Sequence, residues 1–267
     1  MHAFEFNRPK TMKEAVSLLR KVENAKALAG GQSLVAALKL RLARPAALVD
    51  LGALEELRGI KLDGGTLTIG ALTRHSEVAG SKDVAIGVPA LARLAGGIGD
   101  RQVRNQGTLG GAIANNDPAA DYPAAVVGLG ATVNTNKRAI AADKFFAGLY
   151  ETALKPGEVI VSVSFPLPKR AAYVKFRNPA SRFALIGVFV SESSGTVRVA
   201  VTGAGSGVFR VKPMEKRLTE NFSPDAIAKV RVSADDLSSD VHASAEYRAH
   251  LVTVLAQRAV AAAIAGK

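Results

Sequence analysis

The chain has 267 residues, a formal net charge of +12 and 48% hydrophobic residues. This length fits one large or two modest domains, and the apolar content suffices for a buried core, so intrinsic disorder is not expected. The absence of cysteine excludes disulfides, thiolate catalysis and iron–sulfur ligation by this chain. Its four histidines, His2, His75, His242 and His250, are mostly far apart in sequence, so we expect no metal site and predict surface or helix positions for them.

The remaining bulk properties concern location and partners. No apolar run approaches the roughly 18 residues of a membrane span, and the first residues, "MHAFEFNRPK", lack the apolar core of a secretory signal. We therefore expect a soluble, cytoplasmic protein. The basic charge is compatible with nucleic acid, an acidic partner protein or an anionic ligand. Only 5% of residues are aromatic and none is Trp, so the stacking rings typical of single-strand binding are scarce, and we expect no nucleic-acid partner.

The predicted elements begin with a strand, "FEFN", and a helix that opens on the capping pattern of Thr11 and Glu14. A buried strand in "AKALAGG" and a helix over "VAALKLRLA" follow, and then strands at "ALVDL" and "TLTIGAL". Helical segments from residue 76 to 99 precede a helix or buried segment that passes into a strand over "AAVVGLGATVNT". A strand at "EVIVSVSFPLP", a hairpin around "SSG" and a helix at 243–265 complete the chain. Strands and helices mix without a regular βαβ repeat, which favours the α+β class.

Two glycine loops stand out: "LAGGQSL" at 28–34 and "QGTLGGAIA" at 106–114. Glycines let a backbone reach positive φ and approach a ligand closely, and consecutive N–H groups can then form an anion-binding nest. One such loop is most often an ordinary turn, but two, each with a hydroxyl neighbour, are consistent with the two phosphates of a dinucleotide. The known phosphate motifs GxxxxGK[ST] and GxGxxG in a strand–helix context are absent, and we predict that "GAGSG" at 203–207 is a turn. Any dinucleotide site is therefore not of the Rossmann type.

Two aspartates follow the second loop. Asp117, followed by Pro118, is typical of an Asx or N-cap turn. Asp121 needs a different partner beside a phosphate-binding loop, and ribose or adenine groups could supply one. A metal or acid–base pair is the alternative for these two carboxylates.

Four ordered segments carry a specific resemblance: "LAGGQSL", "TIGALTRHSEV", "IGDRQVRNQGTLGGAIANNDPAADYPAA" and "YVKFRNPASRFALIG". With their spacing, the chain resembles, over nearly its whole length, the FAD-binding medium subunits of molybdenum hydroxylases of the carbon monoxide dehydrogenase type. The resemblance implies an α+β fold, with a two-lobed FAD-binding domain of the PCMH (vanillyl-alcohol-oxidase-like) type at 1–170. The lobes would comprise about 1–55 and 56–170, and a smaller α+β flavoprotein C-terminal domain would comprise 171–267.

The resemblance also implies cofactor-binding residues. One side of the FAD diphosphate would be wrapped by Ala29, Gly30, Gly31, Gln32, Ser33 and Leu34, and the other by Thr108, Leu109, Gly110, Gly111 and Ala112. Ile98 would pack near the cofactor, and Asp121 would bind its ribose or adenosine part. Val161 would lie against the isoalloxazine, and Lys175 near its pyrimidine edge, where a cation would raise the flavin potential. For Lys175 the alternative is a solvated side chain on an edge strand.

The chain departs from the family pattern at two positions. Ala112 stands where many members have asparagine, and Phe183 stands near the flavin where the carbon monoxide dehydrogenase flavoprotein has tyrosine. Phe183 can still pack on the ring but offers no hydroxyl.

The function implied is an FAD-carrying electron-transfer subunit of a molybdenum hydroxylase, an oxidoreductase. It would receive electrons from the [2Fe–2S] clusters of a small subunit, while a large subunit holds the molybdenum cofactor, in a dimer of heterotrimers. We expect no catalytic acid or base in this chain. The alternatives are a self-contained FAD oxidase or dehydrogenase of the same fold and, from another class, a basic nucleic-acid-binding module.

Overall fold

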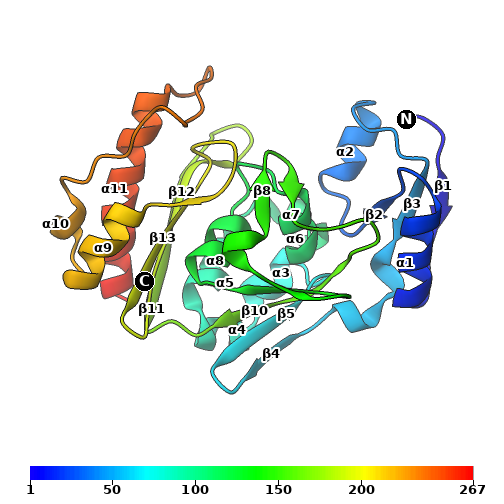
Figure 1. Ribbon diagram of the computed structural model, residues 1–267, viewed down its shortest axis with the longest axis horizontal. Coiled ribbons are helices and arrows are strands. Elements are labelled where there is room, and N and C mark those ends of the chain that lie inside the picture. The colour runs from blue at the N-terminus through cyan, green and yellow to red at the C-terminus, as the bar shows by residue number, and fades with distance from the viewer. Residues whose placement is uncertain (267) are drawn as a thin grey trace.

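The computed structural model describes residues 1–266, which form three larger sheets, each with its own helices, in a row along the long axis, and one two-stranded sheet (Figure 1). The N-terminal strands and helices lie at one end, and the last three helices lie at the other. Among the described residues no helix is both long and apolar enough to cross a membrane.

The N-terminal sheet is parallel, with strand order β1-β3-β2. Its strands and covering helices are β1 (Glu5–Asn7), α1 (Met12–Lys21), β2 (Lys26–Leu28), α2 (Leu34–Lys39) and β3 (Ala47–Asp50). Short 3-10 turns follow at η1 (Leu51–Ala53) and η2 (Glu55–Leu57). Thr11 accepts the N–H of Glu14 at 3.2 Å, as the capping pattern predicts.

Two predictions for this part need correction. The strand predicted as buried is β2, whose Lys26 and Ala27 are exposed because it lies at the edge of the sheet and pairs only with β3. The helix predicted over 35–43 ends at Lys39, because Arg41 turns into the left-handed region with φ +60°. Residues 40–44 therefore form an exposed loop.

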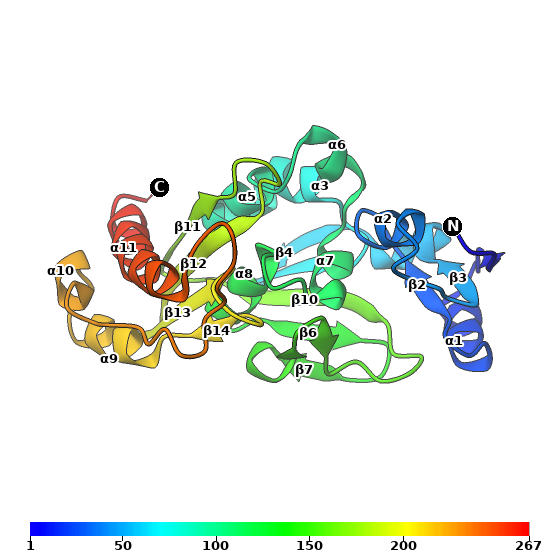
Figure 2. The same cartoon turned by 90° about the horizontal axis from the view of Figure 1, so that it is seen from above.

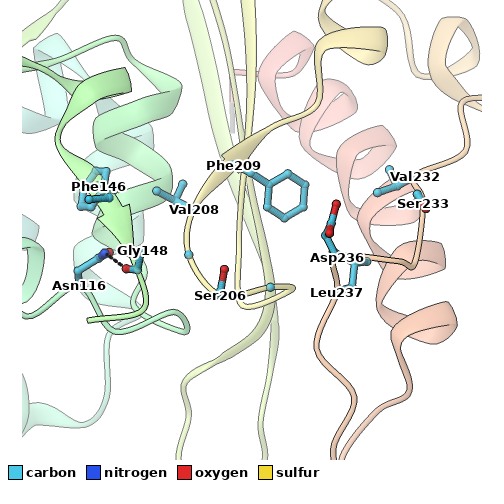
Figure 3. Close-up of a pocket in the computed structure, with 13 residues that line it drawn as sticks. Asn116, Phe146, Gly148, Ser206, Val208, Phe209, Val232, Ser233, Asp236 and Leu237 are labelled. Carbon is cyan, nitrogen blue, oxygen red and sulfur yellow. Dashed lines mark hydrogen bonds between the residues drawn. The ribbon is translucent and has the colours of Figure 1, made fainter. Parts of the chain in front are cut away.

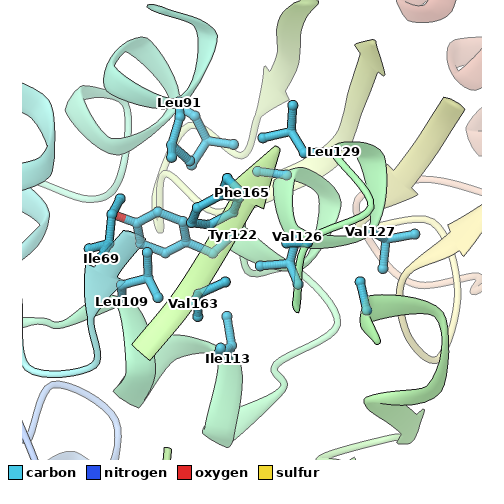
Figure 4. Close-up of a cluster of buried hydrophobic side chains, with 14 of the residues drawn as sticks. Ile69, Leu91, Leu109, Ile113, Tyr122, Val126, Val127, Leu129, Val163 and Phe165 are labelled. Carbon is cyan, nitrogen blue, oxygen red and sulfur yellow. The ribbon is translucent and has the colours of Figure 1, made fainter. Parts of the chain in front are cut away.

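The central sheet is antiparallel, with order β4-β5-β10-β6-β7, and it carries six helices and the β8–β9 hairpin. The strands are β4 (Ile60–Asp63), β5 (Thr66–Gly70), β6 (Thr132–Thr135), β7 (Ala139–Ala141), β8 (Phe146–Gly148), β9 (Glu151–Thr152) and β10 (Ile160–Pro166). The helices are α3 (His75–Gly80), α4 (Lys82–Gly87), α5 (Pro89–Gly96), α6 (Arg101–Gln106), α7 (Leu109–Asn115) and α8 (Tyr122–Gly128), with the 3-10 turn η3 (Ala142–Lys144). Their apolar faces enclose the largest core cluster, which Figure 4 shows around Tyr122 and Phe165.

The C-terminal sheet is antiparallel, with order β11-β12-β13-β14. Its elements are β11 (Arg170–Arg177), β12 (Ala184–Ser193), β13 (Thr196–Thr202), β14 (Phe209–Arg210), α9 (Lys212–Glu220), α10 (Pro224–Ile227) and α11 (Ala245–Ile264). The predicted "SSG" hairpin is confirmed: Ser193 pairs with Thr196, and Ser194 and Gly195 both have positive φ, as a tight two-residue turn requires.

This third sheet is covered on both faces. Val188 and Val190 of β12 pack in the cluster with α9 and α11, while Phe189 between them belongs to the central core. Viewed from above, β11 and β12 lie between α11 and α5 (Figure 2). The alternation of side chains along a strand therefore buries β12 on both faces and fixes the C-terminal sheet against the central part.

Candidate functional site

The first glycine loop connects β2 to α2 and presents free backbone donors. Gly31 has φ +71°, a conformation that favours glycine. Within residues 1–266, the N–H groups of Gly30, Gly31, Gln32 and Ser33 have no protein acceptor. The Ser33 side chain makes no cap hydrogen bond to α2 either. Four successive free donors beside a free hydroxyl are available to the predicted anion-binding nest.

The second loop differs from the predicted nest, because its amides already have protein acceptors. Leu109 N–H donates to the Thr73 carbonyl at 3.1 Å, and Gly110 N–H donates to the Ala71 carbonyl at 2.8 Å. Gly111 N–H donates to Thr108 Oγ1 at 3.1 Å, so Thr108 caps α7. The Thr108 hydroxyl proton remains available as a donor at this turn.

The glycines of these loops are required by contacts within the protein. A Cβ on Gly30 would lie 2.0 Å from the Gln106 carbonyl oxygen, so the two loops touch through bare backbone. A Cβ on Gly110 would lie 2.5 Å from the Ala71 Cβ. Since real Cβ atoms do not approach this closely, these two glycines let the loops pack against each other and against the end of β5.

Together the loops line a cavity of about 610 Å³, within the size range of cofactor and ligand sites. The β8–β9 hairpin and residues 181–183, between β11 and β12, line it from other sides. The predicted site residues that line it are Ala29, Gly30, Gly31, Gln32, Ser33, Leu34, Ile98, Thr108, Gly110, Gly111, Ala112, Asp121 and Phe183. The fold thus brings together residues that lie far apart in sequence.

The other three predicted residues are not among those that line the cavity. Leu109 is fully buried in the central core. Val161 packs against the N-terminal core, and its carbonyl accepts the Ala71 N–H at 2.9 Å, while its neighbours Val159 and Ile160 line the cavity. Lys175 points from β11 to a carboxylate in the wall.

That carboxylate belongs to Asp121 and finds its partners within the protein. Lys175 Nζ lies 2.9 Å from it and the Tyr173 hydroxyl donates to it at 2.6 Å, both from β11. Burial raises the pKa of Asp121, and the Lys175 ammonium opposes that rise. Asp121 therefore has partners within the protein, in addition to the ribose or adenine groups that we predict for it. The alternative that Lys175 is solvated is wrong, since its side chain is only 6% exposed. The Lys175 charge is neutralised at the cavity wall.

His75 is a cavity residue that the sequence analysis did not select. It begins α3, as a helix position was predicted, but it is 4% exposed and lines the cavity. Its backbone N–H donates to the Gly107 carbonyl at 2.9 Å, and its Nδ1 is buried with no partner among the described residues. Burial, with a smaller effect of Arg104, lowers the pKa of His75 to about 4. The sequence signal for His75 is its place three residues after the predicted strand "TLTIGAL".

Asp117 forms the predicted Asx turn, because its Oδ1 accepts the Ala119 N–H at 2.9 Å.

The "GAGSG" segment is a turn, as predicted, and lines a separate cavity of about 410 Å³. Figure 3 shows Phe146, Phe209 and Asp236 around this second cavity. Neither nest residues nor Thr108 line it, so the first cavity is the candidate cofactor site.

Comparisons with known proteins agree with this geometry. A family model described as the FAD binding domain in molybdopterin dehydrogenase matches residues 2–168. The carbon monoxide dehydrogenase medium chain of Hydrogenophaga pseudoflava is 35% identical, over 97% of this chain and 96% of that relative. The nicotine 6-hydroxylase medium subunit of Paenarthrobacter nicotinovorans is 34% identical, over 97% and 96%.

Solved structures give the same result. Carbon monoxide dehydrogenase from Hydrogenophaga pseudoflava matches with a TM-score of 0.88 and 33% identity, over 99% of this chain and 98% of that one. Quinoline 2-oxidoreductase from Pseudomonas putida 86 matches with a TM-score of 0.89 and 29% identity, over 99% and 98%. The predicted α+β fold and family are confirmed: the chain belongs to the FAD-binding flavoprotein subunits of molybdopterin dehydrogenases, which are oxidoreductases.

Proposed function

We propose that this chain is the electron-transfer subunit of a molybdenum hydroxylase, receiving electrons from a small [2Fe–2S] subunit and passing them to an external acceptor. The observation that carries the proposal is the cavity between the two glycine loops, in a chain that spans nearly the full length of medium subunits. The chain has no cysteine to ligate a cluster. A large subunit would hold the molybdenum cofactor, and the assembly would be a dimer of heterotrimers.

The donors and the volume of the cavity are compatible with FAD. The free amides from Gly30 to Ser33 would hold the diphosphate, with the Thr108 hydroxyl opposite, and Phe183 would pack on the flavin side. When bound, FAD would supply reversible redox chemistry between the clusters and the acceptor. We assign the FAD-binding domain to residues 1–170, in lobes of about 1–55 and 56–170, and the C-terminal domain to 171–267.

The relatives' names support the division of labour between subunits. Medium chains or subunits of enzymes named for carbon monoxide, glyceraldehyde and nicotine are 33–35% identical to this chain. One flavoprotein scaffold therefore accompanies enzymes for unrelated substrates. This is consistent with a substrate pocket on another subunit and with the absence of a catalytic acid or base here.

The assembly can be tested by purifying the complex through a tag on this chain from its native host. We expect flavin and iron–sulfur absorption together with two co-eluting subunits. Flavin on this chain alone, with no partners, would instead favour the self-contained flavoenzyme. A colourless chain that takes up no added FAD would refute the cofactor assignment.

The nest can be tested separately with Gly31→Ala. Gly31 and Gly64 both have positive φ, so alanine strains the backbone at either position, but Gly64 lies in the open turn between β4 and β5. We expect Gly31→Ala to lose most of its bound flavin and Gly64→Ala to retain it. Equal flavin content in both variants would remove Gly31 from the site.

A further inference from the structure

The second cavity, of about 410 Å³, has the features of a separate small-molecule site. It lies where the β8–β9 hairpin meets the C-terminal part of the chain, and residues 205–209 and 232–237 supply its other walls. Small-molecule sites have volumes in this range and occur preferentially where domains meet. None of the residues that line it also lines the cofactor cavity.

The walls of this cavity are held by hydrogen bonds within the protein. Asn116 Nδ2 donates to the Gly148 and Glu151 carbonyls, each at 2.8 Å, and so ties the hairpin to the end of α7. On the opposite side, Ser238 N–H donates to the Ala204 carbonyl at 2.8 Å, next to the glycine turn. A ligand would therefore enter a largely preformed site and would need to order little of the chain.

One glycine of the "GAGSG" turn is not required by the fold. Gly203 is required, because it has φ +83° and a Cβ there would lie 2.5 Å from the Ala184 carbonyl oxygen. Gly207 has no positive φ, and a Cβ there would meet nothing within 4 Å. Since Gly207 lines the cavity, its missing side chain is consistent with a wall that leaves room for a ligand.

The charge of the cavity selects a cation. Asp236 is the one charged residue among the 13 that line it, in a chain whose net charge is +12. Within residues 1–266 the Asp236 carboxylate forms no ion pair, whereas the neighbouring Asp235 accepts the Ser233 hydroxyl at 2.6 Å. An unpaired carboxylate with no basic neighbour in the wall attracts a cationic ligand and repels an anionic one.

The apolar part of the lining indicates what kind of cation fits. Figure 3 shows the Phe209 ring facing Asp236, with Phe146 and Val208 on the other side of the chain. A cation between the Phe209 ring and the Asp236 carboxylate would have a cation–π contact and an ion pair. The second ring, Phe146, favours an aromatic body. A metal ion fits less well, because the described residues contain no group of three His, Asp or Glu side chains that could hold one.

We propose that this second cavity binds a small organic cation with an aromatic body, whose ammonium group lies between Asp236 and Phe209. The site is separate from the cofactor cavity, so the proposal does not rest on the proposed function.

The test compares tryptamine with tryptophol, which carries a hydroxyl in place of the ammonium group on the same indole side chain. Each probe is titrated into the full-length chain and followed by calorimetry. We expect tryptamine to bind roughly tenfold more tightly, from one ion pair and one cation–π contact. Asp236→Asn should remove this preference. Asp235→Asn is the matched control and should retain it, because Asp235 does not line the cavity.

The outcomes are distinct from those that test the cofactor site. Equal affinity of the wild type for the two probes, or an unchanged preference in Asp236→Asn, would overturn the cation site. Failure of tryptamine to bind at millimolar concentration would also overturn it. Because Asp236 is exposed, both variants should keep the Tm and the flavin content of the wild type, so a negative result leaves the proposed function intact.

Discussion

Replacing His75 by glutamine should remove a pH-dependent part of the stability of this chain. Burial keeps the imidazole neutral in the fold and lowers its pKa from 6.5 to about 4. A group with a lowered folded pKa contributes stability that is complete above its unfolded pKa and is lost as pH falls through the folded value. At about 1.4 kcal/mol per pH unit, the interval from 6.5 to about 4 amounts to roughly 3 kcal/mol.

The assay is urea unfolding of the FAD-free chain at several pH values between 7 and 4. Carboxylates also titrate in this range, so the quantity to compare is the difference between wild type and His75→Gln. Between pH 7 and pH 4, the unfolding free energy of the wild type should fall by roughly 3 kcal/mol more than that of the variant. His242→Gln, at an exposed position, should follow the wild type. An equal loss of unfolding free energy in the wild type and in His75→Gln would refute the conclusion that the buried imidazole is neutral in the fold.

Two further changes test the walls of the cavity. Lys175→Met leaves the Asp121 carboxylate buried without its ammonium, so we expect a loss of about 3–5 kcal/mol of unfolding free energy. Asp121→Asn added to Lys175→Met should recover much of it, and a double variant no more stable than Lys175→Met would contradict the pairing. Gly30→Ala places a Cβ 2.0 Å from the Gln106 carbonyl, so thermal unfolding should show a lower Tm and absorbance a lower flavin content. Gly80→Ala, with open space around it, should leave both unchanged.

The features that could be predicted from the sequence are local in origin. The "SSG" hairpin follows from turn chemistry, and the helix at Ala245–Ile264 follows from the apolar pattern of the last segment. The two glycine loops were recognisable because hydroxyl and glycine residues cluster there. Each of these features depends on neighbours within a few positions.

The features that could not be predicted depend on distant partners. Asp121 and Lys175 are 54 residues apart, and their pairing exists only because the fold brings β11 to the residue that precedes α8. The same holds for His75, whose burial depends on the Gly107 backbone. A sequence pattern identifies a lysine or a histidine but not the group that will neutralise or bury it.

The two glycine loops illustrate how one residue type supports a cofactor site in two ways. In the first loop, Gly31 adopts positive φ and the neighbouring N–H groups stay free, so we expect them to bind an anion directly. In the second loop, Gly110 gives its N–H to the Ala71 carbonyl and admits the close approach of β5. The second loop therefore positions the first, through the contact of Gly30 with Gln106. Substitutions in either loop should reduce flavin binding, and those at Gly30 and Gly110, whose added Cβ would meet Gln106 and Ala71, should also destabilise the flavin-free fold.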